Sequence, residues 1–272
     1  MAIPSAISRR AVSLHPGGAA DICRALPEEV PVAIVCNGTS QAVMMASPGD
    51  IADFAHGFAL SEGFITSLDQ IEAFEVAEHD SGIEARFWLR QGRAEALAAR
   101  RRFMAGPVGC GLCGIDSLAE AMRPLPQVRA GLGLSRAELI RATEDLRAHQ
   151  PLHDQTHATH AAGFLVPGQG ITHVREDVGR HNALDKLIGA LARQGVDAAG
   201  GAIVMTSRLS VELVQKCAIA GVPVLIAVSA PTAHALRLAE GAGITLAAFV
   251  RGARAQVYSH PIRITNEVPH VA

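Results

Sequence analysis

The stretch from Ala202 to Val250, AIVMTSRLSVELVQKCAIAGVPVLIAVSAPTAHALRLAEGAGITLAAFV, decides the fold class. Its apolar runs predict three strands, at 202–206, 224–228 and 244–250. Two helices that end at glycines are predicted between them, at 211–220 and 233–240. Strands that alternate with helices of about ten residues are typical of parallel βαβ units. Because the strand runs are apolar throughout, we expect helices to cover both faces of the sheet.

The alternation begins further upstream, with a predicted strand at 171–174 and a predicted helix at 183–193. The first half of the chain differs, because it predicts hairpins: strands at 32–36 and 41–45 around Asn37-Gly38, and at 71–77 and 83–89. Ser47 and Asp50 are expected to form a capping box at the start of a helix between these hairpins. The first 20 or so residues are polar and basic, and we expect them to be loosely ordered.

These patterns predict an α/β protein with two domains. Residues 1–128 are expected to form an N-terminal α+β domain that ends in a cysteine-containing loop. Residues 129–272 are expected to form an α/β domain with a largely parallel sheet, and the boundary is placed in the Pro- and Gly-rich segment 124–133.

Composition narrows the class of function. The net charge of −2 and the pI near 6.6 argue against a general nucleic-acid-binding protein. No run approaches the ~18 apolar residues of a membrane span, and the N-terminus lacks the pattern of a signal peptide. The five cysteines are too few and too scattered for a disulfide framework, so we expect reduced thiols and a cytoplasmic location.

The chemically informative thiols are Cys110 and Cys113, a CxxC pair in a glycine-rich segment. Half of a zinc site, a disulfide-exchange pair and a sulfur carrier that holds a persulfide are all compatible with this spacing. The zinc-deaminase signature is absent, because no histidine has Glu two residues later and Pro107 does not directly precede Cys110. Cys23, Cys36 and Cys217 have apolar neighbours in the sequence and are interpreted as small core residues.

Arginines follow the predicted strands of the second half. In an open parallel sheet the carboxyl ends of the strands share one rim, where ligands bind. That rim would gather Arg175, Arg180, Arg208, Arg251 and Arg254. Arginine side chains suit phosphate, so the rim predicts a phosphorylated or dinucleotide ligand. Each arginine taken singly also fits an ordinary ion pair, for example with Glu176, Asp177 or Glu212.

Several histidines are candidates with structural alternatives. His181 is either an acid–base group or a hydrogen-bonding structural residue. Asp185 and Lys186 are expected on the solvated face of the predicted helix. His149, His153, His157 and His160 would share one face of a continuous helix and suit a metal, although Pro151 weakens that interpretation.

At this point the sequence resembles the FdhD family. The resemblance rests on GCGLCG at 109–114, THAAGF at 159–164, VREDVGRHNALDKLIG at 174–189 and the long segment 207–252. It covers most of the chain, from about residue 32 to residue 258. The family often has a Gly-Gly pair shortly before the histidine that matches His160, where this chain has Ala-Thr.

The resemblance implies a sulfurtransferase that formate dehydrogenase requires. Family members take sulfur from a cysteine desulfurase as a persulfide on the CxxC loop, so Cys110 would be the main carrier and Cys113 its helper. The sulfur acceptor would be the molybdenum bis(molybdopterin guanine dinucleotide) cofactor, bound as a substrate, which GDP-like nucleotides mimic. The nucleotide would bind at Phe249, Val250, Arg251, Gly252, Ala253 and Arg254, and Arg208, Arg180 and His181 would hold another part of it. The resemblance also implies a homodimer, and a cytidine-deaminase-like three-layer C-terminal domain that lacks the zinc chemistry.

Two rival functions remain. One is a molybdenum-cofactor chaperone that moves no sulfur, which would work without either thiol. The other is a thiol–disulfide oxidoreductase, which would reduce disulfides and ignore guanine nucleotides.

Overall fold

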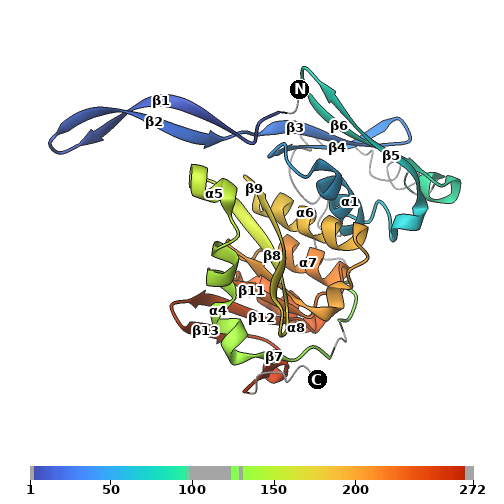
Figure 1. Ribbon diagram of the computed structural model, residues 1–272. Coiled ribbons are helices and arrows are strands. Elements are labelled where there is room, and N and C mark those ends of the chain that lie inside the picture. Colours follow the sequence, from blue (N-terminus) through green and yellow to red (C-terminus); the bar gives the residue numbers. More distant parts are fainter. Residues whose placement is uncertain (1–2, 96, 98–123, 129–130, 267–272) are drawn as a thin grey trace.

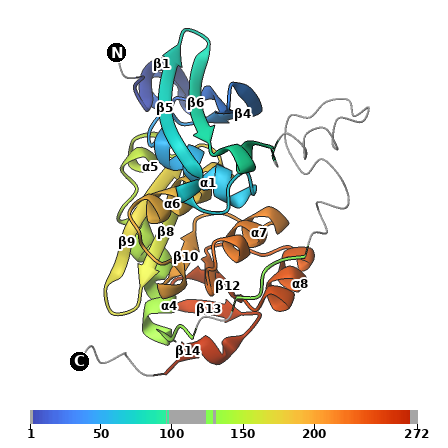
Figure 2. The same ribbon diagram turned by 90° about the vertical axis from the view of Figure 1, so that its right-hand side faces the viewer.

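The computed structural model describes residues 3–95, 97, 124–128 and 131–266. Two mixed β-sheets form the body of the molecule, and the helices α1 and α6 lie between them (Figures 1 and 2). A two-stranded ribbon projects from the body (Figure 1). The predicted mixture of α/β and α+β structure is confirmed.

The four-stranded sheet is built by the first half of the chain and has the order β4-β3-β6-β5. Its strands are β3 (Val30–Cys36), β4 (Thr39–Ala46), β5 (Ile71–His79) and β6 (Gly82–Leu89). The helix α1 (Ile51–Ser61) packs on one face, and the short 3-10 helix η1 (Leu68–Gln70) directly precedes β5. Both predicted hairpins are confirmed. Asn37 and Gly38 adopt positive φ at the first turn, as a two-residue hairpin connection requires.

The six-stranded sheet has the order β13-β12-β11-β10-β8-β9. Its strands are β8 (His160–Val166), β9 (Gly170–Asp177), β10 (Ala202–Met205), β11 (Val224–Ala227), β12 (Thr245–Arg251) and β13 (Arg254–Val257). The central strands β10, β11 and β12 are parallel, as predicted, whereas β8, β9 and β13 add antiparallel pairs at the two sides.

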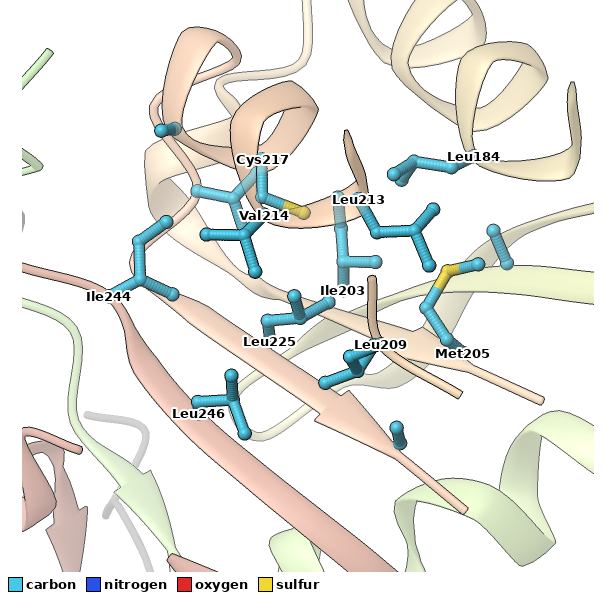
Figure 3. Packing of buried hydrophobic residues seen from close by; sticks show 14 of the residues in the cluster. Leu184, Ile203, Met205, Leu209, Leu213, Val214, Cys217, Leu225, Ile244 and Leu246 are labelled. Atoms are coloured by element: carbon cyan, nitrogen blue, oxygen red, sulfur yellow. The ribbon is translucent and has the colours of Figure 1, made fainter. Parts of the chain in front are cut away.

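Helices cover both faces of this sheet, which confirms the three-layer arrangement. They are α4 (Arg136–Arg147), α5 (Pro151–Thr156), α6 (Arg180–Arg193), α7 (Val211–Ile219) and α8 (Ala233–Ala242). Ile203 packs against α6, α7 and α8, while its neighbour Val204 faces α4, because successive side chains of a strand point to opposite faces. Figure 3 shows the first of these cores, in which Leu213, Val214 and Leu225 surround Ile203.

Short elements complete the fold. They are η2 (Ala198–Gly200), η3 (Pro261–Arg263) and a small parallel sheet of β7 (Leu134–Ser135) and β14 (Ile264–Thr265). Ser135 and Glu138 form a reciprocal capping box at the start of α4.

Two glycines let α1 and α6 pack without side chains between them. A Cβ on Gly57 of α1 would lie 1.8 Å from the carbonyl oxygen of Asp185, and one on Gly189 of α6 would lie 1.9 Å from that of Asp53. These separations are far below van der Waals contact. The two sheets are therefore joined through a helix crossing that admits only glycine at these positions.

Buried ion pairs surround this crossing, and they correct one prediction. The ammonium of Lys216 on α7 is 3.0 Å from both carboxylate oxygens of Asp185 and donates to Ser61 and Glu62 of the α1 end. Burial opposes the charge on Lys216, but Asp185 and Glu62 outweigh it and raise its pKa. Asp185 was expected on a solvated helix face, yet it is 1% exposed because it neutralises this ammonium.

Lys186 was also predicted to be solvated and is also buried. Its ammonium lies 2.8 Å from Asp177 and donates to the carbonyl of Ser47 at 2.9 Å. The same contact explains why the predicted Ser47–Asp50 capping box is wrong. The Ser47 amide donates to Asp177, its hydroxyl accepts from Val178, and Asp50 stands at the N-cap of α1 with φ 56° and no side-chain cap.

The N-terminal residues are not loosely ordered. They form a hairpin, the arm, made of β1 (Ala6–His15) and β2 (Gly18–Pro27) in continuous antiparallel register. The run Pro16-Gly17-Gly18 was the one local signal, and it marks the turn of this hairpin. The arm also corrects the assignment of Cys23 to a core, because Cys23 is exposed there. Cys36 and Cys217 are buried as predicted, and burial raises the pKa of Cys36 to about 11.

Two sequence predictions need separate mention. Among the described residues, no helix combines the length and the apolarity that a bilayer crossing demands. The division at residues 128 and 129 stays a prediction.

Candidate functional site

The predicted rim exists on the six-stranded sheet. β8 is antiparallel to both β9 and β10, so β9 runs in the same direction as the parallel strands β10, β11 and β12. The carboxyl ends of these four strands therefore meet at one edge of the sheet. The loops after β10 and β11 are tied to each other there, because Leu209 donates to Ala230 and accepts from Thr232.

The turn between β12 and β13 is the most distinctive part of the rim. Arg251 and Arg254 stand opposite each other in the register, joined by Gly252 and Ala253 with φ of 54° and 60°. Like charges at directly opposed positions destabilise a strand pair, and positive φ is unfavourable for alanine. Such strain is typical of binding sites, and an anion between the two guanidinium groups would relieve the repulsion.

The neighbouring backbone fixes this turn in place. Phe249 has φ 53° next to a bulge in β12, and its side chain is half-buried against the core under α8. Val250 is buried, and its carbonyl accepts from the Thr143 hydroxyl of α4 at 2.6 Å. The arginines are thus exposed on a loop whose base is held by the core.

A pocket of about 590 Å³ opens beside the turn, under α4 and α5. Its wall includes Arg251, Thr206 and Val228 from the strand ends and His160 from the start of β8. The other residues that line it are Thr143, Glu144, Arg147, Gln150, His153, His157, Ala158 and Thr159. Sequence reasoning missed the contribution of α4, although the Ser135–Glu138 capping-box pattern marks the start of that helix.

The histidine series does not lie on one continuous helix. His149 falls between α4 and α5, His157 follows α5 with φ 54°, and His160 belongs to β8. Pro151 begins α5 and separates the helices. His153, His157 and His160 nevertheless reach the same pocket. No group of three or more His, Cys, Asp or Glu side chains suited to a metal occurs within the described ranges.

A second group of polar side chains lies where α6 begins. Arg180 is the first residue of α6, and His181 follows it. The Nε2 atom of His181 lies 3.1 Å from the Ser210 hydroxyl and 3.3 Å from Glu212. Contact with His181 lowers the pKa of Glu212 to about 2, so Glu212 is ionised at neutral pH. Burial, followed by the charge of Arg180, lowers the pKa of His160, which connects this group to the pocket.

Two arginines of the predicted rim behave differently. Arg208 is exposed in the loop that follows β10. Arg175 is not available, because its guanidinium donates to Asp53 of α1 at 2.6 and 2.9 Å. The ion-pair alternative therefore holds for Arg175, with a partner from the first half of the chain that the sequence did not indicate.

The two candidate catalytic thiols, Cys110 and Cys113, lie outside the described residues. Their predicted role is neither supported nor opposed by the geometry of the rim.

The model of the FdhD/NarQ family matches residues 27–265. The chain belongs to the FdhD/NarQ family. A relative from Agrobacterium fabrum, named sulfur carrier protein FdhD, is 51% identical over 242 residues, which are 89% of this chain and 89% of the relative. A protein of the same name from Bordetella petrii is 45% identical over 247 residues, 91% of this chain and 89% of its own length.

A solved structure is also similar to this chain along nearly its whole length. A crystal structure ascribed to a formate dehydrogenase accessory protein from Desulfotalea psychrophila superposes with a TM-score of 0.74 at 27% identity. The match covers 96% of this chain and 100% of that chain. The rim, the pocket and the α1–α6 crossing all lie inside the FdhD/NarQ match, whereas most of the arm precedes it.

Proposed function

We propose that this protein is a sulfurtransferase that carries sulfur from a cysteine desulfurase to the molybdenum bis(molybdopterin guanine dinucleotide) cofactor of formate dehydrogenase. The names of the FdhD relatives, which are sulfur carriers, support the sulfur chemistry. The proposal of an anionic substrate rests mainly on the opposed pair Arg251 and Arg254, which lie on a strained turn. The protein would act in the cytoplasm, where its thiols stay reduced.

In the proposed binding mode the guanine nucleotide lies on the segment from Phe249 to Arg254. The exposed arginines contact its phosphates, because a guanidinium offers several N–H donors to phosphate oxygens. The half-buried Phe249 offers an aromatic surface near the base. Arg208, Arg180 and His181 hold another part of the same substrate, toward its metal end.

The proposed chemistry uses both thiols. The Cys110 thiolate attacks the desulfurase persulfide and takes its terminal sulfur, and the desulfurase cysteine leaves as a thiolate. The Cys113 thiolate then attacks the Cys110 sulfur, which forms a disulfide and releases hydrosulfide. Hydrosulfide together with one proton from the solvent replaces an oxo ligand of the metal, which leaves as water, and a dithiol reductant then restores the two thiols.

The proposed assembly is a homodimer, and the arm supports it. An isolated two-stranded ribbon is at best marginally stable in water, and this one exposes Val12 by 60% and Leu14 by 81%. A second copy of the chain would cover these side chains.

Sulfur labelling tests the transfer step. Incubation with a cysteine desulfurase and ³⁵S-labelled cysteine should place label on the wild-type protein that dithiothreitol releases. The Cys110→Ala, Cys113→Ala double variant should acquire almost none, because thiolates are the acceptors. Undiminished labelling of the double variant would refute sulfur carriage and favour a cofactor chaperone.

Calorimetry with GDP tests the nucleotide site. Replacing Arg251 or Arg254 by Gln should weaken GDP binding at least about tenfold, since a hydrogen bond to a charged group contributes about 1.5–3 kcal/mol. Arg237→Gln, which removes an exposed arginine of α8, is the matched control and should bind like wild type. If the wild-type protein ignored GDP while reducing disulfides, the oxidoreductase alternative would replace the proposal.

A further inference from the structure

A nearly buried amide without a partner lies in the wall of the 590 Å³ pocket. Gln150 is 2% exposed, yet its carboxamide makes no hydrogen bond within the described part of the chain. The amide is not enclosed by protein either, because Arg180 Nε is the one fully enclosed side-chain atom without a partner among those residues. The Gln150 amide therefore faces the pocket. Since buried polar groups in native structures are almost always paired, an unpaired one that faces a pocket indicates a ligand there.

A carboxylate from α4 lines the same wall. Glu144 makes no ion pair and no side-chain hydrogen bond with the residues that the structure describes. The Thr143 hydroxyl donates to the Val250 carbonyl at 2.6 Å, and the residues that follow these two are Glu144 and Arg251. The carboxylate and the guanidinium thus come from adjoining segments and line one pocket, although they do not pair with each other. A ligand with N–H donors and a negative charge would satisfy both.

The rest of the pocket suits a planar ring. The imidazole of His153 is fixed by its Nδ1–H, which donates to the Thr159 carbonyl at 3.0 Å. The His157 ring meets it edge-on, with 5.8 Å between the ring centroids. Val228 and Ala158 add apolar surface. Flat and apolar walls with a few polar groups are typical of sites for small heterocycles, and the volume lies within the usual range of about 300–1,000 Å³.

The two unpaired side chains match one heterocycle edge. A 2-amino-4-oxopyrimidine edge presents a ring N–H and an amino group as donors and an oxo group as acceptor. A carboxylate only accepts hydrogen bonds, and a carboxamide donates two. Adenine has a ring acceptor in place of the ring N–H, which a carboxylate would repel. Guanine and pterin both carry the matching edge, and both are parts of the proposed substrate.

We propose that Glu144 and Gln150 select the 2-amino-4-oxopyrimidine edge that guanine and pterin share. Glu144 accepts from the ring N–H and the amino group, and Gln150 donates to the oxo group. The inference rests on the proposed substrate and deepens it, because it names residues that distinguish its heterocycle from others.

Either ring of the substrate can supply this edge. Val250 packs on the α4 side of the six-stranded sheet, where the pocket lies, whereas Phe249 packs on the α8 side. A guanine held beside Phe249 would leave the pocket to the pterin, and a guanine that enters the pocket would fill it alone. The experiment therefore follows both rings.

Matched pairs of ligands isolate the amino group. Inosine diphosphate is GDP without that group, and lumazine is pterin with an oxo group in its place. Calorimetry measures the Kd of the nucleotides, and ligand fluorescence measures that of the pteridines. The wild-type protein should bind GDP or pterin at least about tenfold more tightly than its matched partner, since a hydrogen bond to a carboxylate is lost. The pair that shows this preference identifies the ring that occupies the pocket.

Variants test the two side chains. Glu144→Gln should abolish most of the preference, whereas Glu240→Gln, the same change at an exposed glutamate of α8, should leave it intact. Gln150→Met should weaken binding of both members of the pair about fivefold, the effect of one neutral hydrogen bond. It should not lower the Tm, because the amide that it removes has no partner to lose. This combination separates loss of the site from loss of the fold.

Two results would overturn the inference. One is a wild-type protein without a preference in either pair, and the other is a preference that survives in Glu144→Gln. GDP binding that is weakened by Arg251→Gln but equals inosine diphosphate binding would refute the inference alone and leave the proposed function standing. Absence of sulfur labelling beside a Glu144-dependent preference would refute the proposed sulfur transfer and leave the heterocycle site standing.

Discussion

Replacing Gly189 by Ala should destabilise the protein by about 3 kcal/mol or more, at the upper end of what overpacking costs. The added methyl would lie 1.9 Å from the Asp53 carbonyl oxygen and 2.7 Å from the Gly57 amide nitrogen. Both atoms belong to the backbone of α1, so no side-chain rotation can relieve the clash. The helices must separate, and the free energy of unfolding measured in urea should fall accordingly.

Gly241→Ala is the matched control, because Gly241 is also a helical glycine, but a Cβ added there would meet nothing within 4 Å. This change should stabilise the protein by about 0.5–1 kcal/mol, the ordinary gain of alanine over glycine in a helix. A Gly189→Ala variant as stable as Gly241→Ala would show that the α1–α6 contact is looser than described.

Lys216→Met should lower the free energy of unfolding by about 3–5 kcal/mol, because it leaves a buried carboxylate without its counterion. The Asp185 side chain is 2% exposed, and the Lys216 side chain is 5% exposed. The Ser61 hydroxyl still donates to Asp185 in the variant, but one neutral donor does not replace an ammonium. Urea denaturation at pH 7 measures the loss.

A double-mutant cycle separates the ion pair from packing. Lys216→Met combined with Asp185→Leu removes both charges and should recover more than half of the loss, as replacement of buried pairs by apolar groups does elsewhere. Arg147→Met breaks the exposed Arg147–Asp154 pair and should cost no more than about 1 kcal/mol. A Lys216→Met cost as small as that of Arg147→Met would contradict the assignment of a buried, charged pair.

The alternating strands and helices of the second half were predictable because burial on both faces gives a continuous apolar signal. Ile203 and Val204 face opposite sides of the sheet, yet both are buried, so both are hydrophobic. The strand could therefore be predicted without knowing which face each residue occupies. β8 was missed because Ala161 and Ala162 carry a weak strand propensity, and the strand forms through pairing with β9 and β10. The arm was missed because its residues are exposed, so no apolar periodicity marked it.

The only part of the site that could be predicted was the set of residues that follow the ends of strands. Arg251 and Arg254 were placed correctly on the rim because both follow an apolar strand. Arg175 also follows a strand, but its partner Asp53 comes from a helix more than a hundred residues earlier, and no local pattern reports such a contact. Asp185 and Lys186 were misjudged for the same reason, since polar residues on a predicted helix normally face water.

The glycine crossing has a mechanical consequence for cargo transfer. With backbone against backbone at Gly57 and Gly189, and with Lys216 and Lys186 bonded across the same junction, the two sheets form one rigid block without a hinge. Closure of one sheet against the other, a common way of enclosing a substrate, is therefore not expected for the described part of the chain. In the proposed transfer, sulfur would therefore reach the rim without any change in how the two sheets pack on each other.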